Sequence, residues 1–378
     1  MRNVSLLILI AAVVYGFALG QPSLWDIDEA IYAEISRGMA ESGDWVMPFY
    51  NGEPRYDKPP LIYWITAAAM RVTGPTELAA RIGPYLFALL SAILAYALGK
   101  RYYSRRAGAL SALVLTSTLG WFVAGRMGLM DTGLSFFVGL CVYLLARVAS
   151  APGQRRLAEY LGIGLVAALG VLTKGPVALV LVGGAALLGL GLPKVWRALN
   201  LSGVLLAIGV FALVALPWHL AIYARAGSAW WESYFGYHMF ARFTQPLEEH
   251  GFPWYFYVIV LVVGFLPWTG YGLAAGWNLI RRRPAGDGAR LMVGWAAFVV
   301  LFFSLSRTKL PGYILPAFVP LAVLTGAWCD ERLRRLDAER AFSRGLWASL
   351  VGGLLAAGGL VLLRPLVPAG YEGAYRLL

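Results

Sequence analysis

Long uninterrupted apolar segments, separated by short polar stretches, dominate this chain of 378 residues. As helices, several of these segments are long enough to cross a hydrocarbon core of about 30 Å. They are rich in Leu, Ala, Val and Gly, whereas a transmembrane β-barrel needs short segments of alternating polarity. The pattern predicts an all-α, polytopic helical membrane protein. We expect eleven spans, at about residues 4–20, 76–99, 107–123, 132–148, 158–173, 176–192, 200–220, 252–276, 289–306, 311–328 and 345–363.

The first apolar segment has two interpretations. It begins with a basic residue and ends in small residues, as a cleaved signal peptide does. It is also long enough to be a retained first transmembrane helix, which is the interpretation we favour. In both cases the chain from residue 21 onward emerges outside the cytoplasm, so the predicted topology does not depend on the choice.

Composition and charge agree with a membrane protein. Hydrophobic residues make up 59% of the chain and charged residues 14%, and the mean hydropathy of +0.66 is not that of a soluble domain. The net charge is +12, but the basic residues cluster in short loops such as 100–106, 281–284 and 331–340, which is the positive-inside pattern. We therefore place residue 2 and these loops in the cytoplasm and expect no nucleic-acid partner.

The two cysteines, Cys141 and Cys329, fall in different apolar segments. We expect both to lie near the cytoplasmic half of the membrane, on separate helices. A disulfide framework or a zinc–cysteine site is therefore not predicted.

Two outer loops are too long to be simple connections. The first, residues 21–75, is expected to hold an amphipathic helix over 28–42 and a more apolar helix, from residue 58, that lies in the membrane interface. The second, residues 221–251, carries aromatic residues that suit the headgroup region. We find no internal repeat or flexible linker in the sequence, so we expect residues 1–378 to form a single transmembrane domain.

Ionisable residues from five separate loops reach one membrane face in this topology. Many surface charges are merely solvated, but Asp131, Lys174 and Lys309 lie in short turns between apolar runs, where ionisable groups are costly and usually functional. Cations can hold a phosphate, and carboxylates can accept a hydroxyl proton or stabilise a cationic sugar ring. We therefore expect a substrate with both hydroxyl and phosphate groups. The candidate residues are Asp26, Asp28, Glu29, Asp57, Lys58, Arg126, Asp131, Lys174, His238, Arg242, Arg307 and Lys309.

Six motifs, in this order, resemble those of the GT-C membrane glycosyltransferases. The resemblance is to the bacterial branch that contains the lipid A aminoarabinose transferases and to the related protein O-mannosyltransferases, and it covers about residues 5–330. A single acidic pair would be a weak motif, whereas six in order are far more specific. The motifs are DEAIYAEISRGM from residue 28, GDWVMPFYNGEPRYDKPPLIYW from 43, GRMGLMDTGLSFF from 125, LTKGPVALVL from 172, YHMFARF from 237 and SRTKLPGYILP from 306.

The resemblance implies roles for the matching residues. Asp28 and Asp131 correspond to the two carboxylates central to catalysis, and Lys58 to the cation that meets the lipid phosphate. Segments that line the donor-lipid cavity contain Tyr32, Arg307, Lys309 and Tyr313, and we also expect Arg126, Lys174 and Arg242 at the substrate. Such enzymes take a sugar from a polyprenyl phosphate at the outer side of the inner membrane, and they are expected to need no nucleotide sugar.

Glu29 is left open between two roles. Beside Asp28 it could be a second functional carboxylate at the substrate. Adjacent residues on a helix, however, point about 100° apart, so the two side chains need not face the same site.

The chain departs from the family pattern at three points. The longer members carry a soluble periplasmic domain after the membrane part, which we do not expect here, and Ile31 stands where the aminoarabinose branch usually has a cation. That branch can also hold a structural zinc on a carboxylate, a loop histidine and a histidine of the soluble domain. Asp57 and His238 match the first two ligands, but a zinc site normally has three or four. We therefore expect no required cofactor and leave a structural zinc or another divalent cation open.

The sequence does not choose the acceptor. A sugar or serine hydroxyl must lose a proton, so a carboxylate base helps, whereas a phosphate monoester on lipid A is already anionic and needs cations more than a base. We expect transfer, with inversion, from undecaprenyl phosphate to lipid A or another envelope acceptor on the periplasmic face. Protein O-glycosyl transfer is the alternative within the same fold.

Two other classes of function are compatible with the composition. A non-enzymatic lipid or solute transporter would also contain intramembrane charges, but it should show a midplane site and often inverted repeats, which we do not find clearly in the sequence. An accessory subunit that needs a partner for activity is the third possibility.

Overall fold

Helices make up nearly all of the described structure, so the predicted all-α fold class is confirmed. The computed structural model describes residues 2–24, 27–151, 156–246, 252–282 and 286–335, together with residues 343, 345–347, 349 and 351. Within those residues, strands are confined to an antiparallel hairpin of β1 (Phe49–Tyr50) and β2 (Glu53–Pro54). Asp26 and most of the predicted span 345–363 lie outside the described residues.

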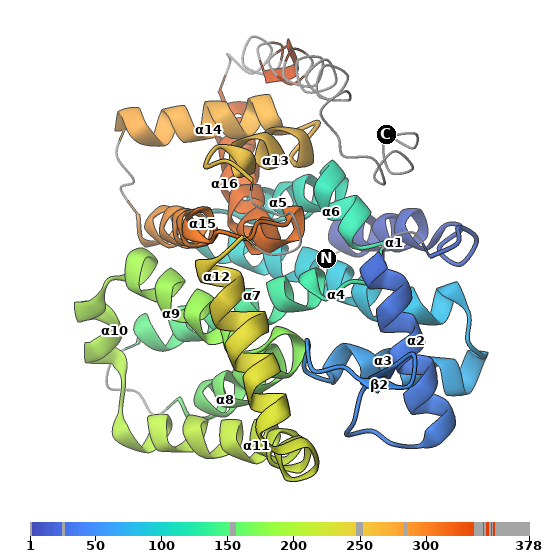
Figure 1. Ribbon diagram of the computed structural model, residues 1–378. Coiled ribbons are helices and arrows are strands. Elements are labelled where there is room, and N and C mark those ends of the chain that lie inside the picture. Colours follow the sequence, from blue (N-terminus) through green and yellow to red (C-terminus); the bar gives the residue numbers. More distant parts are fainter. Residues whose placement is uncertain are drawn as a thin grey trace.

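The helices surround a centre formed by α4 and α7 (Figure 1). Groups formed by α1 to α3, by α8, α9 and α11, and by α13 to α16 lie around that centre. Their bounds are α1 (Arg2–Gly16), α2 (Ile27–Ser42), α3 (Leu61–Thr73), α4 (Glu77–Tyr102), α5 (Arg105–Ser117), α6 (Leu119–Ala124), α7 (Asp131–Ala149), α8 (Leu157–Lys174), α9 (Val177–Leu190), α10 (Leu192–Ala198), α11 (Leu201–Trp231), the π-helix η1 (Glu232–Ala241), α12 (Arg242–Thr244), α13 (Phe256–Gly264), α14 (Thr269–Arg282), α15 (Asp287–Leu305), the 3₁₀-helix η2 (Pro311–Ile314) and α16 (Leu315–Leu333).

Six helical segments of the described chain are long and apolar enough to cross a membrane. They are α4, α7, α8, the run 201–244 that begins with α11, α15, and the run 311–333 that contains α16. Each overlaps one of the predicted spans, from 76–99 to 311–328. The first predicted span, 4–20, is a shorter apolar helix, α1.

The remaining predicted spans are interrupted rather than straight. The chain bends by 105° between α9 and α10 at Gly191, which has a φ of +83°, and by 116° between α13 and α14, across a segment that contains Pro267. Counting each bent pair as one span gives up to eight in the described residues. The predicted span 107–123 is divided at Thr118, whose extended backbone separates α5 from α6. Ten of the eleven predicted spans fall in the described residues, and ten continuous spans were an overestimate there, because apolar composition alone does not reveal these breaks.

Small residues allow the central helices to approach closely. A Cβ atom on Gly99 of α4 would lie 2.7 Å from Cα of Gly108 on α5, and a Cβ on Gly326 of α16 would lie 2.5 Å from the backbone nitrogen of Ser111. Apolar side chains gain little from leaving lipid for a protein interior, so close packing of this kind is a main source of helix association in membranes.

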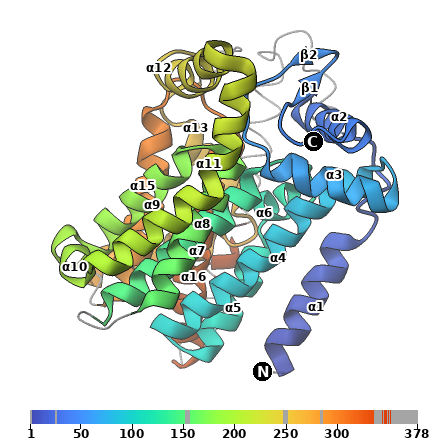
Figure 2. The ribbon, with the colours of Figure 1, turned by 90° about the horizontal axis from the view of Figure 1, so that it is seen from below.

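The elements that carry the candidate motifs gather at one end of the bundle. Figure 2 shows α2, α3, the hairpin and α12 at its upper end. The run 201–244 would be about 66 Å long as one helix, roughly twice the hydrocarbon thickness, but it breaks at Gly227 (φ 57°, ψ −137°). The part beyond that break is not needed for crossing, and it contains η1. A π-helix is rare and frequently marks a functional site.

Candidate functional site

Asp131 is the point where three turns of the chain meet. It is the first residue of α7, and Nζ of Lys174 lies 2.5 Å from its Oδ1. The same ammonium lies 4.8 Å from the centre of the Tyr313 ring. A Cβ atom on the neighbouring Gly312 would lie 2.7 Å from Oδ2 of Asp131. Lys174 therefore neutralises Asp131, and the turn at Gly312 covers the carboxylate closely.

Tyr32 brings the first-loop acids together with Asp131. Its buried ring lies edge-to-face against Tyr63, with 5.7 Å between the ring centres. Burial raises the pKa of Tyr32, and the carboxylates of Asp57, Asp28 and Asp131 raise it further. Charge interactions weaken with distance, so all three carboxylates lie in the neighbourhood of this phenol. The structure thus gathers Asp28 of α2 and Asp131 of α7, which are far apart in the sequence.

Asp57 is a buried carboxylate that already has partners. The Nε atom of Arg55 and the Nζ atom of Lys58 lie 3.3 and 3.6 Å from Oδ2, and the hydroxyl of Tyr63 donates to Oδ1 at 3.5 Å. Burial opposes ionisation, but Lys58, Arg55 and His238 together hold the pKa of Asp57 below its usual range. Lys58, the predicted phosphate-binding cation, is therefore anchored beside Asp57, with 13% of its side chain exposed.

The two predicted metal ligands lie near each other. His238 of η1 is close enough to Asp57 for the two charges to interact, and burial, followed by Lys58, lowers the pKa of His238 to about 4. The imidazole is therefore neutral at pH 7, as a metal ligand must be. The described residues nevertheless contain no group of three His, Cys, Asp or Glu side chains that could hold one ion. A bound cation stays a prediction, with two ligands in place where a structural zinc needs more.

Arg307 and Lys309 lie in a turn that presents positive charge. The backbone N–H groups of Arg307 and Thr308 donate to the carbonyls of Phe243 and Arg242 at 3.0 and 3.3 Å, which fixes the turn against α12. The ammonium of Lys309 is buried and donates to the carbonyl of Ser306 at 2.6 Å. Burial and the neighbouring Arg307 lower the pKa of Lys309.

This turn is short of negative charge. Among the described residues, no carboxylate lies within 4.0 Å of a side-chain nitrogen of Arg307 or Lys309. Arg242 extends the same cationic group, and its Nη1 donates to the Tyr313 hydroxyl at 3.4 Å. Because Tyr313 also contacts Lys174, this group adjoins Asp131. The group therefore combines a buried ammonium, that of Lys309, with the half-buried Arg242 and the exposed Arg307. Such an excess of positive charge beside carboxylates that already have partners suits an anionic ligand.

Two residues predicted to bind substrate have their partners in the scaffold of the fold. Glu29 is fully buried and forms a bidentate ion pair with Arg81. Arg126 donates to the carbonyls of Tyr15 and Phe17 at the end of α1, the latter at 2.8 Å. The sequence analysis did not single out Arg81. Its charge inside the apolar segment 76–99 could have revealed it, because ionisable residues within membrane segments are usually functional.

The buried polar atoms near the site that make no hydrogen bond to the described residues include the Tyr234 hydroxyl and Nδ1 of His238. Both belong to η1. Gly175, which follows Lys174 with a φ of +82°, approaches the Tyr234 hydroxyl so closely that a Cβ there would lie 2.6 Å from it. Buried unsatisfied polar atoms in a native fold call for an explanation, and a polar ligand is one.

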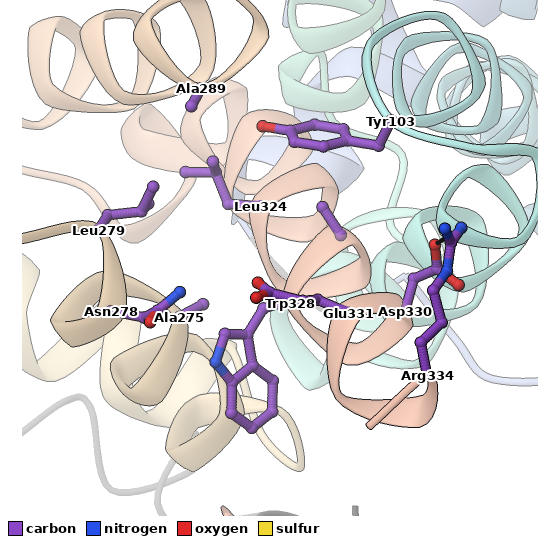
Figure 3. A pocket seen from close by; sticks show the side chains of 11 residues that line it. Tyr103, Ala275, Asn278, Leu279, Ala289, Leu324, Trp328, Asp330, Glu331 and Arg334 are labelled. Carbon is purple, nitrogen blue, oxygen red and sulfur yellow. Dashed lines mark hydrogen bonds and ion pairs between the residues drawn. The ribbon is translucent and has the colours of Figure 1, made fainter. Parts of the chain in front are cut away.

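A cavity of about 320 Å³ lies elsewhere, between the ends of α4, α14 and α16 (Figure 3). Its lining includes Tyr103, Trp328 and Arg334, which lies beside Asp330. Trp328 lies in the C-terminal half of α16 and Arg334 directly follows that helix, whereas Tyr313 precedes its start, and the 19-residue helix is about 28 Å long. The cavity is therefore separate from the group around Asp131.

Comparison with known proteins supports one class. A family model described as dolichyl-phosphate-mannose-protein mannosyltransferase matches residues 57–221. The undecaprenyl phosphate-α-4-amino-4-deoxy-L-arabinose arabinosyl transferase of Pseudomonas paraeruginosa (strain DSM 24068 / PA7) is 34% identical over 379 residues, which cover 99% of this chain and 68% of the relative. The transferase of the same name from Edwardsiella ictaluri (strain 93-146) is 33% identical over 357 residues, covering 93% and 63%.

Solved structures agree with this similarity. The crystal structure of ArnT from Cupriavidus metallidurans bound to undecaprenyl phosphate matches with a TM-score of 0.82 and 28% identity, over 99% of this chain and 68% of that one. The archaeal oligosaccharyltransferase AglB from Archaeoglobus fulgidus matches with a TM-score of 0.56 at 13% identity, a likeness of fold alone.

A multi-pass helical bundle with carboxylates and cations gathered on the turns at one end is the architecture of a GT-C membrane glycosyltransferase, and this chain is one. Within that class it belongs to the family of undecaprenyl phosphate-aminoarabinose arabinosyl transferases. It spans about two thirds of the length of these relatives.

Proposed function

We propose that this glycosyltransferase moves a sugar from undecaprenyl phosphate, or a closely related polyprenyl phosphate, to lipid A or another cell-envelope acceptor. The reaction would take place at the periplasmic face of the inner membrane, where the positive-inside pattern places α2, α3 and η1. The names of the relatives support this donor. The observation that carries the proposal is the turn with Arg307 and Lys309, for which the described residues supply no carboxylate within 4.0 Å. The chain continues from this turn to Gly312, which closely approaches the paired carboxylate Asp131.

The donor phosphate is assigned to the turn that holds Arg307 and Lys309, together with Arg242. Charge builds on this phosphate as it leaves the sugar, so cations held in position beside it favour the transition state over the ground state. Lys58 adds a fourth cation from the first loop. Lys174 has a different role, because it neutralises and orients Asp131.

Asp28 is assigned as the base for a hydroxyl acceptor. The acceptor oxygen forms a bond to the anomeric carbon as the bond from that carbon to the phosphate oxygen breaks, and the phosphate leaves with the electron pair. Asp28 takes the acceptor proton, while Asp131 orients the acceptor or the sugar ring. Attack from the face opposite the phosphate inverts the anomeric configuration. Tyr32 lies near these carboxylates and would contact the sugar.

The acceptor distinguishes two versions of this function. Lipid A carries phosphate monoesters, whose second pKa is about 6, and such an acceptor needs less help from a base. Transfer to a protein hydroxyl is the second candidate, supported by the match of residues 57–221 to the protein mannosyltransferase family model. Loss of activity in Asp28→Asn with a hydroxyl acceptor, but only a partial loss with a phosphate acceptor, would separate the two.

The cationic turn provides the test of this proposal. The purified protein is given undecaprenyl-phosphate aminoarabinose with a lipid A acceptor, and release of undecaprenyl phosphate is followed by mass spectrometry. Arg307→Gln and Lys309→Gln should each lower kcat/KM for the donor by about tenfold to a hundredfold, since each removes a charge-assisted contact worth roughly 1.5–3 kcal/mol. Arg225→Gln, at an exposed ion pair with Asp44, is the matched control and should keep full activity. Wild-type activity that both turn variants retain would contradict the assignment.

A further inference from the structure

A buried ion pair joins the first loop to the bundle. Nε and Nη2 of Arg81, on α4, lie 2.8 and 3.0 Å from the two carboxylate oxygens of Glu29. The exposed fractions of the two side chains are 4% and 0%. Arg81 also donates to three backbone carbonyls of the segment between α1 and α2, those of Leu19, Pro22 and Ser23, at 2.8 to 3.0 Å.

Glu29 has another partner, which belongs to the other catalytic segment. The backbone N–H of Gly128 donates to its Oε1 at 2.6 Å. Gly128 lies three residues before Asp131, in the turn that leads into α7. A Cβ atom at residue 128 would lie 3.0 Å from Cγ of Glu29 and 3.1 Å from the carbonyl oxygen of Ala80, so only glycine fits this approach without displacement.

The contacts therefore link the segments that carry the two proposed catalytic carboxylates. Asp28 is the residue before Glu29, and Asp131 follows the turn held by Gly128. Both segments are fixed to α4, the longest single crossing helix in the described chain that has no break. Errors of about 1 Å in the position of a catalytic group can cost a factor of about 100 in rate.

We infer that Glu29 is a positioning residue, and that the unit of Glu29, Arg81 and Gly128 sets the relative position of Asp28 and Asp131. The unit does not itself touch the substrate, since both carboxylate oxygens of Glu29 face Arg81 and one also accepts from Gly128. The inference rests on the proposed function for its catalytic consequence, but not for its structural one.

The structural consequence is measured without a substrate. Hydrogen–deuterium exchange of the purified protein in detergent is compared for wild type, Glu29→Gln and Glu34→Gln. The inference predicts faster exchange in Glu29→Gln in both residues 27–34 and residues 125–131. Glu34→Gln, which breaks a half-exposed ion pair with Arg37 on the same helix, should leave residues 125–131 unchanged. Faster exchange in Glu29→Gln that is confined to residues 27–34 would overturn the inference.

The catalytic consequence is measured by turnover of the sugar donor per folded molecule. Glu29→Gln, Arg81→Gln and Gly128→Ala should each lower kcat by tenfold to a hundredfold, with the donor KM changed less than twofold and the pH profile unmoved. The double variant of Glu29→Gln and Arg81→Gln should be no worse than the more impaired single variant, because the residues act as a unit. Full kcat in Glu29→Gln with a lowered melting temperature would reduce the residue to a purely structural one.

A third result would assign Glu29 to the chemistry. If Glu29→Gln is inactive while Arg81→Gln is active with an acid limb moved to higher pH, Glu29 is a titrating base and the inference is wrong. An inactive wild-type protein would contradict the proposed function instead, and the exchange measurement would still decide whether the unit links the two segments.

Discussion

At the scale of single residues, the site is organised by which charges have partners. Asp131 is paired with Lys174, and Asp57 with Arg55 and Lys58. Arg307 and Lys309, by contrast, have no carboxylate within ion-pair distance in the described chain. Removing one partner from a buried pair is costly because it leaves the other charge uncompensated. The paired acids are therefore fixed in position, whereas the proposed phosphate-binding turn would exchange its local contacts for the phosphate.

The close approach at Gly312 gives a first prediction. A Cβ there would lie 2.7 Å from Oδ2 of Asp131, so Gly312→Ala must displace either the turn or the carboxylate. We expect kcat to fall by about tenfold or more with little change in melting temperature. Gly38→Ala on α2, where a Cβ meets no atom within 4 Å, is the control and should behave as wild type. Unchanged kcat in Gly312→Ala would show that the position of Asp131 is not critical.

Asp57 gives a prediction on pH and stability. Its pKa is lowered in the folded protein, so its ion pairs contribute stability above the unfolded-state value of about 3.9. That contribution is lost as the pH falls through the folded-state pKa. The melting temperature of the wild type should therefore drop more steeply below about pH 4 than that of Asp57→Asn. The exposed variant Glu53→Gln should follow the wild-type curve, and parallel curves for wild type and Asp57→Asn would refute this role.

At the scale of secondary-structure elements, the candidate residues lie where helices are interrupted. The turn after α8 needs Gly175 in a left-handed conformation, and Lys174 precedes it directly. The turn 306–310 is held by hydrogen bonds to α12, which follows η1. Polar turn residues between apolar runs indicated from the sequence that Asp131, Lys174 and Lys309 lie at such breaks. The break at Gly227, the π-helix and the bends at Gly191 and near Pro267 have no comparable sequence pattern, because tertiary packing decides whether a helix continues through them.

Arg126 gives a prediction at this scale. Its guanidinium donates to the last carbonyls of α1, a common way to satisfy a helix C-terminus. Arg126→Ala should lower the free energy of unfolding by about 1.5–3 kcal/mol, the range for hydrogen bonds to a charged group. Turnover per folded molecule should remain close to that of the wild type, as measured in detergent after removal of unfolded protein. A raised donor KM with an unchanged free energy of unfolding would show that Arg126 contacts the substrate, as the sequence predicted.

At the scale of the whole molecule, the fold class and the grouping of the site could be predicted, and the pairing within the site could not. Apolar segments with basic loops on one side established a polytopic bundle and brought Asp28, Asp131, Lys58 and Lys309 to one end. Whether a charge in that group has a partner depends on distances of a few ångströms between distant segments. Glu29 is the clearest case, because its role became visible only through Arg81 and Gly128.

We propose that Asp28 and Asp131 act on a sugar whose phosphate is held by the cationic turn. Mass spectrometry tests this with purified protein incubated with a panel of polyprenyl-phosphate sugars and a lipid A acceptor, for wild type, Asp28→Ala and Asp131→Ala. We expect wild type to release the bare polyprenyl phosphate from one donor, and both variants to bind this donor but to transfer at least a hundredfold more slowly. Full transfer by either variant, or tight lipid binding by wild type without turnover of any donor, would contradict it.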